Sequence, residues 1–489
     1  MGKHWSRRLR GALAVLATTG LLAGCAQVVD GSASVGNAPN AELKVVGDSG
    51  GAFDTSVKNS LSDVFDFWTG EYPKIAGGKA FTPLKGGLYS VDGAKVAETK
   101  EVPAEAKDEA CMQKSPTFII DNGAFCTLDD SISWDRAPAH LFAQLAQKYG
   151  SLMVALVFAH EVGHAISYRK GIFQRTDLRT IDTESQADCA AGAWAAWALK
   201  GNAAHFRDVT PQKLDDALEG FLDGRDATPG TPDDISHGNG FDRLSAVADG
   251  IDKGASYCYS DGYFASRSFT ERQFETEADF NSGGNSPIEN ILTTDPKNDF
   301  VRDLNRFWEA AAKTRKQSFN PVKIAEAAHP KCGAASASSE FGYCPDDNTV
   351  YFDSKFAEQV YNSLPTVEFD RTTANVTLQE NQPGDFALGV MFSIGWGMAV
   401  RHQLFNRDLT SKDALLAAVC YTGSYAKNVN VPANTPGRFI VLSPADLDEA
   451  VSAMLAQVGK PQAFSDRGTT GLDRVQSFVK GYRGGLQVC

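Results

Sequence analysis

The feature that most constrains the fold is internal repetition, because residues 58–258 resemble residues 297–489. The segment GFDR followed by Cys258 matches GLDR followed by Cys489. Cys189 and Cys420 are offset from each other by the same amount, so the two segments have cysteine pairs of identical spacing. Further matches follow in the same order and at similar offsets. This repetition predicts two diverged copies of one structural unit.

The cysteines indicate disulfides that respect the repeat. Apart from Cys25, the chain has eight cysteines, an even number typical of an exported protein. The simplest symmetric pairing keeps every bond within one copy. It predicts the bonds Cys111–Cys126, Cys189–Cys258, Cys332–Cys344 and Cys420–Cys489.

The N-terminus predicts export. Four basic residues within the first ten precede a short apolar stretch, residues 11–23, which is too short to span a bilayer stably. Its end, LAGC, resembles the bacterial lipobox, in which the cysteine receives the lipid; the alternative is an ordinary signal peptide with an incidental cysteine. We therefore expect a lipoprotein signal peptide over residues 1–24, lipidation of Cys25 and a flexible tether over residues 25–52. The protein is then anchored to the cell membrane on its extracytoplasmic face, and its net charge of −13 argues against nucleic-acid binding.

The stretch FAHEVGHA contains an HExxH pattern within an apolar run. His160 and His164 lie at i and i+4, so on a helix they share one face and can bind one zinc ion. Glu161 can act as general base on a zinc-activated water. The alternative is a core helix with two histidines that are satisfied by hydrogen bonds.

A second segment supplies the third ligand that a zinc site needs. Glu184 follows His164 in the chain and opens a predicted helix. Asp188 is at i+4 from Glu184, on the same helical face, where it can accept a hydrogen bond from a ligating histidine. The sequence thus predicts one Zn²⁺ per chain on His160, His164 and Glu184.

The segments HEVGHAIS and ESQADCAAGAW together resemble the neutral zinc metallopeptidase family, which is the YpfJ-like group. Within this family the chain most resembles the lipoprotein peptidases of mycobacteria and related actinobacteria. The resemblance implies a gluzincin-type site with Glu161 as base. It also implies a His-Gly pair before the final helix, which here is His237-Gly238. His237 is therefore a candidate to stabilise the oxyanion of the reaction, the alternative being an ordinary loop histidine.

Together these observations predict a mainly helical α+β fold with two copies of a zincin-like unit, each with a small hairpin or sheet and a core HExxH-type helix. We expect the zinc unit at residues 53–258, a connector at 259–296 and a degenerate unit at 297–489. Helices are predicted over 141–149, 152–168, 184–199 and 211–222. A hairpin of residues 116–120 and 131–134 is expected before the zinc helix, with 131–134 as an edge strand for peptide substrates.

The second copy departs from the pattern at every metal position. The zinc-binding positions 160, 164 and 184 correspond to Ile394, Met398 and Leu415, and the base position corresponds to Gly395. Asp188 corresponds to Val419, so we expect this copy to have a structural role or to bind a protein partner. The function predicted for the whole chain is a zinc-dependent peptidase acting on peptide or protein substrates. Two alternatives are a non-proteolytic zinc-binding envelope protein and a zinc amidase acting on cell-wall peptides.

Overall fold

The computed structural model describes residues 37–225, 237–295, 297–327, 340–370, 375–382, 384–455 and 467–489. The chain divides into two units, Met1–Gly36 and Asn37–Cys489, and every described residue belongs to the second. The predicted signal peptide and the lipidation of Cys25 lie outside the described residues. Residues 37–51, part of the expected tether, are ordered against the first copy, since Val46 exchanges backbone hydrogen bonds with Leu88 and Ser90.

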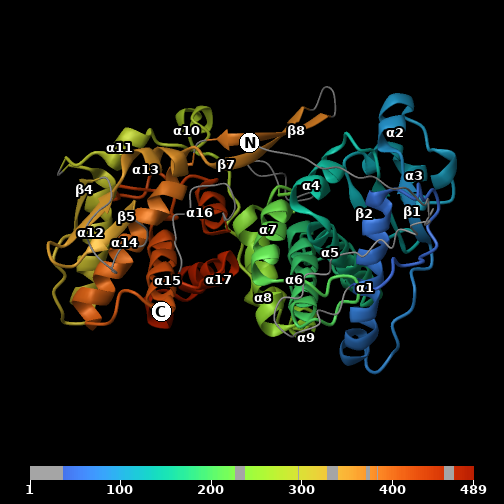
Figure 1. The fold of residues 1–489 in the computed structure, drawn as a ribbon, viewed down its shortest axis with the longest axis horizontal. Helices are drawn as coiled ribbons and strands as arrows, with labels where there is room; N and C mark the ends of the chain where they lie inside the picture. The colour runs from blue at the N-terminus through green and yellow to red at the C-terminus, as the bar shows by residue number, and fades with distance from the viewer. Residues whose placement is uncertain are drawn as a thin grey trace, which may run out of the picture. The chain divides into compact units, whose positions relative to one another are not determined.

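The first copy is mainly helical with one small sheet (Figure 1). Its elements are α1 (Ala52–Ile75), β1 (Gly87–Val91), α2 (Gly93–Thr99), α3 (Ala110–Lys114), β2 (Gly123–Cys126), β3 (Ser131–Asp135), α4 (Leu141–Tyr149), α5 (Ser151–Arg169), α6 (Thr180–Leu199), α7 (Pro211–Leu222), α8 (Gly240–Lys253) and α9 (Ala255–Cys258). By length and composition α5 could cross a membrane, but 78% of its most apolar window is buried, so it is the core helix of this copy.

The sheet corrects the predicted hairpin in two respects. Pro116–Ile119 is a 3-10 helix, and the antiparallel partner of β3 is β2. Pro116 has no N–H to donate to a strand partner, and Ile119 is buried in a small cluster with Val91 and Met112. The strand order is β1-β3-β2, with β1 parallel to β3. The strand that begins at Ser131 is therefore central, and β2 is the edge strand that contacts α5.

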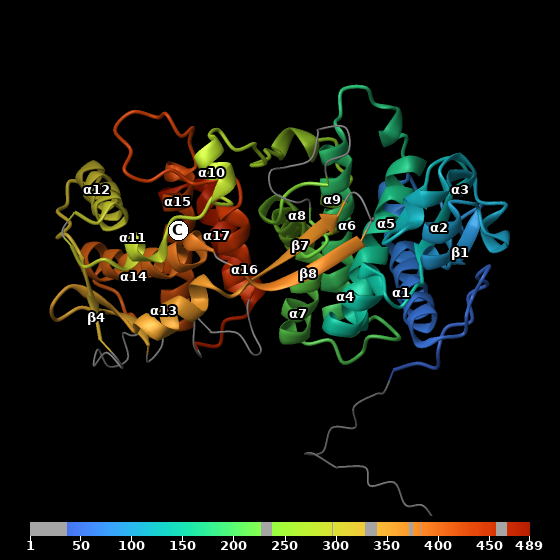
Figure 2. The same cartoon turned by 90° about the horizontal axis from the view of Figure 1, so that it is seen from above.

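The second copy repeats this arrangement after a connector. The connector holds the short helices α10 (Glu277–Asn281) and α11 (Ile288–Leu292). The second copy contains α12 (Asp299–Thr314), β4 (Lys323–Glu326), β5 (Phe341–Cys344), β6 (Thr349–Phe352), α13 (Ser354–Tyr361), β7 (Leu364–Asp370), β8 (Asn375–Gln382), α14 (Asp385–Phe405), α15 (Lys412–Val429), α16 (Asp446–Leu455) and α17 (Gly471–Gly484). Its sheet has the order β4-β6-β5, again with one parallel and one antiparallel pair. The β7–β8 pair is extra and lies between α16 and α4 (Figure 2).

The two copies also share a close helix crossing. A Cβ on Gly192 would lie 2.0 Å from the carbonyl oxygen of Val247, and one on Gly250 would lie 1.9 Å from that of Cys189. The corresponding glycines of the second copy are as close: a Cβ on Gly423 would lie 2.0 Å from the carbonyl oxygen of Phe478, and one on Gly481 would lie 1.8 Å from that of Cys420. Backbones can meet this closely only where both helices present glycine, so α6 crosses α8 as α15 crosses α17.

Three disulfides occur among the described residues and follow the symmetric pairing. They are Cys111–Cys126, Cys189–Cys258 and Cys420–Cys489. The second and third have the same sequence separation, and each joins a core helix, α6 or α15, to the last residue of its copy. Cys344 is also disulfide-bonded, and its predicted partner Cys332 lies outside the described residues.

The copies contact each other through α7 and α8 on one side and α16 and α17 on the other (Figure 1). Each copy caps a helix of the other with a buried carboxylate. Asp215 of α7 accepts hydrogen bonds from the amides of Gly471 and Leu472 at the start of α17, at 2.6 and 2.8 Å. Asp448 of α16 accepts one from the amide of Phe241 at the start of α8, at 2.9 Å. These contacts satisfy helix N-termini and fix the interface.

Candidate metal centre

Two crossing helices bring the predicted metal ligands together. The helix α5 carries His160, Glu161 and His164 on its buried face, and α6 carries Glu184 and Asp188. Between the two histidines lies Gly163, where an added Cβ would be 3.1 Å from the Cα of Ala187 and 3.0 Å from the Cβ of Ala190. The glycine and the small residues of α6 allow the helices to approach, so that Glu184 reaches the histidines.

The ligand atoms converge on one point. The Nε2 atoms of His160 and His164 are 3.0 Å apart. The carboxylate of Glu184 lies 3.1 Å from Nε2 of His160 and 3.3 Å from Nε2 of His164. Ligands at about 2.0–2.1 Å from a tetrahedral zinc ion are about 3.3 Å from one another, so these separations suit one ion. The exposed fractions are 4% for His160, 8% for His164 and 9% for Glu184, so the group is buried.

The hydrogen bonds around the group leave lone pairs directed at its centre. Asp188, which is fully buried, lies 2.7 Å from Nδ1 of His160. A proton on Nδ1 leaves the lone pair of His160 Nε2 free for a metal. Within the described part of the chain, Oε2 of Glu184 is buried without a hydrogen bond, because its contact with His160 lacks hydrogen-bond geometry. This buried His160–His164–Glu184 group could hold a metal ion.

The electrostatics of the group favour a positive charge at its centre. Burial alone lowers the pKa of His160, but the charge and hydrogen bond of Asp188, with contributions from Glu184 and Glu161, raise it to about 10. Burial raises the pKa of Glu184, yet the charge of His164 and the contacts with both histidines hold that pKa well below its usual range. The carboxylates are therefore ionised, and either a proton or a metal ion balances them.

Arg243 of α8 supports Asp188 from behind. Its Nη2 lies 3.1 Å from Oδ1 of Asp188 and its Nε lies 3.2 Å from Oδ2, while its guanidinium covers the ring of Phe221 at 4.3 Å. Burial raises the pKa of Asp188, but the charges of Arg243 and His160 lower it further than burial raises it. In the second copy Arg474 occupies the corresponding position and donates to the carbonyl of Met454. The arginine is thus part of both scaffolds, and in the first copy Asp188 joins it to His160, a candidate metal ligand.

Glu161 lies beside the ligands, at the edge of the sheet. Its Oε2 accepts a 2.8 Å hydrogen bond from the amide of Phe125 in β2, and its Oε1 is 4.0 Å from Nε2 of His160. No sequence pattern indicates this amide, because it comes from β2, a strand well before α5 in the chain.

A cavity of about 200 Å³ opens beside Glu161 and His160. His237 and Arg243 also line this cavity, so the histidine implied by the family resemblance lies in its wall. Asp121, Asn122 and Gly123, at the start of β2 and just before it, also line the cavity. The larger apolar side chains of the lining come from α4, α5 and α7: Leu141, Phe142, Leu145, Met153, Val157 and Phe221. The amphipathic spacing of α4 and α7 indicates buried faces, but spacing alone does not reveal that those faces form a cavity wall.

In the second copy, apolar packing replaces the metal group. Ile394, Met398, Leu415 and Val419 are all at most 1% exposed. At the base position, a Cβ on Gly395 would lie 2.7 Å from a methyl group of Val350. Such side chains offer no strong metal ligand, so the described part of this copy has no counterpart of the zinc-type group.

Comparisons of the chain with family models, with curated proteins and with solved structures found no match.

Proposed function

We propose that the protein is an exported zinc metallopeptidase, anchored to the cell membrane through lipidated Cys25. One observation carries this proposal: the ligand atoms of His160, His164 and Glu184 converge within 3.0 to 3.3 Å, with Glu161 beside them. Two imidazoles and one carboxylate form a ligand set that catalytic zinc sites use, with a fourth position left for water or substrate. The segments HEVGHAIS and ESQADCAAGAW, which resemble motifs of neutral zinc metallopeptidases, agree with this assignment.

Zinc bound by these residues would supply a Lewis acid that polarises the scissile carbonyl and activates water. The carboxylate of Glu161 takes the water proton and delivers it to the leaving amine. The amide of Phe125 holds one oxygen of Glu161, which leaves the other directed toward the ligands. Asp188 fixes the ring of His160, and His237 in the cavity wall can donate to the developing oxyanion.

The apolar cavity suggests which substrate side chains fit. Leucine, phenylalanine and methionine side chains surround its polar end at His160 and Glu161. A peptide with a bulky apolar residue next to the scissile bond would bury that residue here. We therefore expect faster cleavage beside leucine or phenylalanine than beside aspartate.

For the second copy we propose descent from the same ancestral unit and a supporting role. The glycine crossings recur at the same offset as the cysteine pairs, and the sheets share one strand order. Its carboxylate Asp448 caps α8, the helix that carries Arg243. This copy can therefore help to hold the metal centre without binding metal at the corresponding positions.

The decisive experiment compares the wild type with Glu161→Gln. The variant keeps the shape of the side chain and should bind zinc as the wild type does, while kcat falls by about 10²–10⁴-fold because the base is lost. Zinc content by atomic absorption and cleavage of a fluorogenic peptide library measure the two quantities. His160→Ala is the matched control and should lose both zinc and activity. Full activity of Glu161→Gln would exclude the assigned role.

The substrate class needs a separate comparison. Wild-type protein should cleave peptides in a chelator-sensitive way. Cleavage of peptidoglycan fragments without cleavage of peptides would instead identify a cell-wall amidase. Zinc binding with cleavage of neither substrate would indicate a non-proteolytic zinc protein.

A further inference from the structure

The second copy contains a buried acidic cluster of its own. Asp385 is the first residue of α14, and Asp446 and Glu449 lie on the first turn of α16. One oxygen from each carboxylate lies within 4.8 Å of the others. Asp446 and Glu449 are each only 4% exposed. Three carboxylates are therefore crowded together; Asp446 and Glu449 are buried and Asp385 is half-buried.

Two carboxylate oxygens of this cluster lack the hydrogen bonds that burial demands. One oxygen of each residue accepts a 2.8 Å bond from a backbone amide; the donors are Ser286 for Asp385, Ser443 for Asp446 and Phe386 for Glu449. The Oδ1 atoms of Asp385 and Asp446 are buried and have no hydrogen-bond partner among the described residues. Because an unpaired buried carboxylate oxygen is costly, these two atoms point to a missing positive group.

Side chains of the described residues do not provide that positive group by contact. Among them, no ion pair within 4.0 Å involves Asp385, Asp446 or Glu449; the charge of Arg272 acts on Asp446 only from a greater distance. Burial, followed by the charges of Asp385 and Glu449, raises the pKa of Asp446 well above its usual range. Burial raises the pKa of Asp385 to about 6. The cluster must therefore hold either extra protons or a bound cation.

The first copy provides an internal comparison. Alignment of Gly150 with Gly384 places Ser151 at the position of Asp385, and alignment of Thr210-Pro211 with Ser443-Pro444 places Lys213 and Asp216 at those of Asp446 and Glu449. Lys213 forms an exposed ion pair with Asp208. The acidic cluster is thus specific to the copy that lacks the zinc ligands, so a shared helix-packing requirement does not explain it.

We propose that Asp385, Asp446 and Glu449 form a binding site for a divalent cation, Ca²⁺, that joins the start of α14 to α16. All the ligand atoms are oxygens, which suit hard cations, whereas zinc in proteins favours nitrogen and sulfur. Ca²⁺ accepts irregular geometry and carboxylate oxygens at about 2.3–2.6 Å, and opposite ligands are then about 4.8 Å apart. An ion here would neutralise the mutual repulsion and satisfy the orphaned oxygens.

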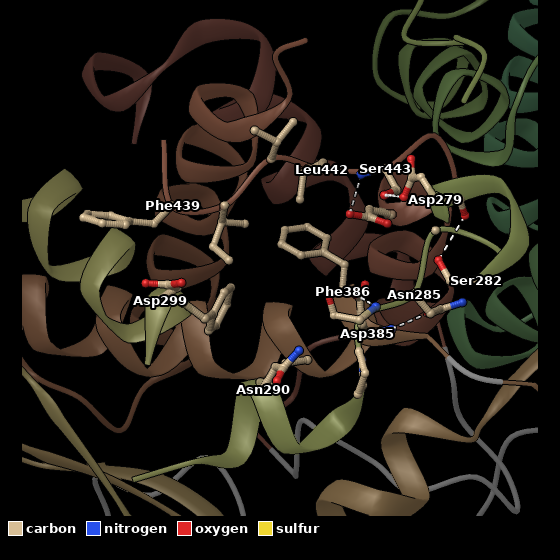
Figure 3. Close-up of a pocket in the computed structure, with 18 of the residues that line it drawn as sticks. Asp279, Ser282, Asn285, Asn290, Asp299, Asp385, Phe386, Phe439, Leu442 and Ser443 are labelled. Atoms are coloured by element: carbon tan, nitrogen blue, oxygen red, sulfur yellow. Dashed lines mark hydrogen bonds between the residues drawn. The ribbon is translucent and has the colours of Figure 1, made fainter. Parts of the chain in front are cut away.

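The site is accessible from solvent. It borders a hollow of about 870 Å³ whose lining includes Asp385 and Asp446. Figure 3 shows Asp385 next to Asn285, and Ser443 next to Asp279, in this hollow. The hollow gives a cation a way in and leaves room for the water molecules that complete Ca²⁺ coordination.

Calcium titration of the full-length, zinc-loaded protein tests the proposal, with thermal unfolding and isothermal titration calorimetry as readouts. We expect CaCl₂ to raise the Tm of the wild type with a Kd of about 10⁻³ M or tighter, and MgCl₂ to act more weakly. Asp446→Asn and Glu449→Gln should each weaken Ca²⁺ binding at least tenfold. Without Ca²⁺ both variants should unfold at or above the wild-type Tm, because each replaces a carboxylate that must otherwise be neutralised by a proton with a neutral amide. If one variant does not fold, the other still decides.

Two controls make the result specific. Asp299→Asn removes a charge from the lining of the same hollow, outside the cluster, and should leave Ca²⁺ binding unchanged. His160→Ala should also bind Ca²⁺ normally, which separates this site from the zinc site. The proposal is overturned if millimolar Ca²⁺ leaves the wild-type Tm unchanged, since the cluster is then held together by protons. It is equally overturned if Asp446→Asn and Glu449→Gln retain wild-type affinity.

Discussion

Asp188→Asn tests whether the carboxylate behind His160 sets the affinity for zinc. The variant preserves the volume of a side chain that is fully buried. It removes the negative charge of a carboxylate whose oxygens lie 2.7 Å from Nδ1 of His160 and 3.1 and 3.2 Å from Nη2 and Nε of Arg243. The amide group can offer one oxygen to only part of this set, so either His160 or Arg243 faces an N–H donor instead.

The expected magnitude follows from these contacts. Loss of a partner that orients a metal-bound histidine costs about 10–100-fold in metal affinity, which is about 1.4–2.7 kcal/mol. Arg243 is 7% exposed, and after the substitution its charge has lost its buried counter-ion near the metal. That uncompensated charge repels zinc, so we expect a loss toward 100-fold.

The assay is competition for Zn²⁺ with a chromophoric chelator at neutral pH, together with near-UV circular dichroism of the zinc-free proteins. Asp177→Asn is the matched control, because it removes the same charge from an exposed residue that pairs with Arg175. The control should bind zinc as the wild type does. A folded Asp188→Asn protein with wild-type zinc affinity would refute the reasoning that Asp188 orients the ligand.

Three further predictions concern stability and covalent structure. Burial raises the pKa of Asp242 to about 7, so the folded protein holds a proton that the unfolded chain releases near pH 4. This residue should lower the unfolding free energy by up to about 1.4 kcal/mol per pH unit between pH 4 and 7, and urea titrations of Asp242→Asn should show a slope that is smaller by this contribution. Gly250→Ala should lower the unfolding free energy by about 1–3 kcal/mol or more, because the added Cβ would lie 1.9 Å from a carbonyl oxygen. Gly70→Ala, on α1, has nothing within 4 Å of the added Cβ and should raise the unfolding free energy by about 0.5–1 kcal/mol in the same titrations. Peptide mapping of the unreduced protein should recover Cys332 joined to Cys344, and a bond between the two copies would contradict the symmetric pairing.

The sequence allowed the metal group to be predicted because its determinants are local. His160 and His164 stand at i and i+4 on one helix, and so do Glu184 and Asp188 on the next. Helical periodicity alone then places each pair on one face. Only the crossing of the two helices was non-local, and the small residues around Gly163 indicated close packing there.

The parts that the sequence did not reveal depend on pairing between distant segments. The parallel partner of β3 is β1, which comes much earlier in the chain, and nothing in the local pattern of Gly87–Val91 specifies that partner. The prediction of a hairpin strand at 116–120 is wrong because a short stretch of alternating polarity cannot distinguish a strand from a 3-10 helix. The acidic cluster of the second copy was missed for the same reason, since Asp385 and Asp446 belong to different helices far apart in the chain.

The interface gives a physical reason for keeping a copy without zinc ligands. Asp448 of the second copy caps the start of α8, and shortly after the capped amide of Phe241 comes Arg243, which contacts Asp188. Asp188 in turn contacts His160. The first turn of α8 and the hydrogen bonds of Arg243 and Asp188 therefore connect the second copy to the candidate metal group. In the reciprocal contact, Asp215 of the first copy caps the start of α17 in the second copy, where apolar side chains stand at the ligand positions. Asn239 and Thr470 cap α8 and α17 from within their own copies, and the carboxylate of the other copy accepts further hydrogen bonds from the first turn. Removal of the second copy would therefore leave the amide of Phe241 without the acceptor that Asp448 provides. The cost would reach the candidate metal group through Arg243, although that group consists of residues of the first copy.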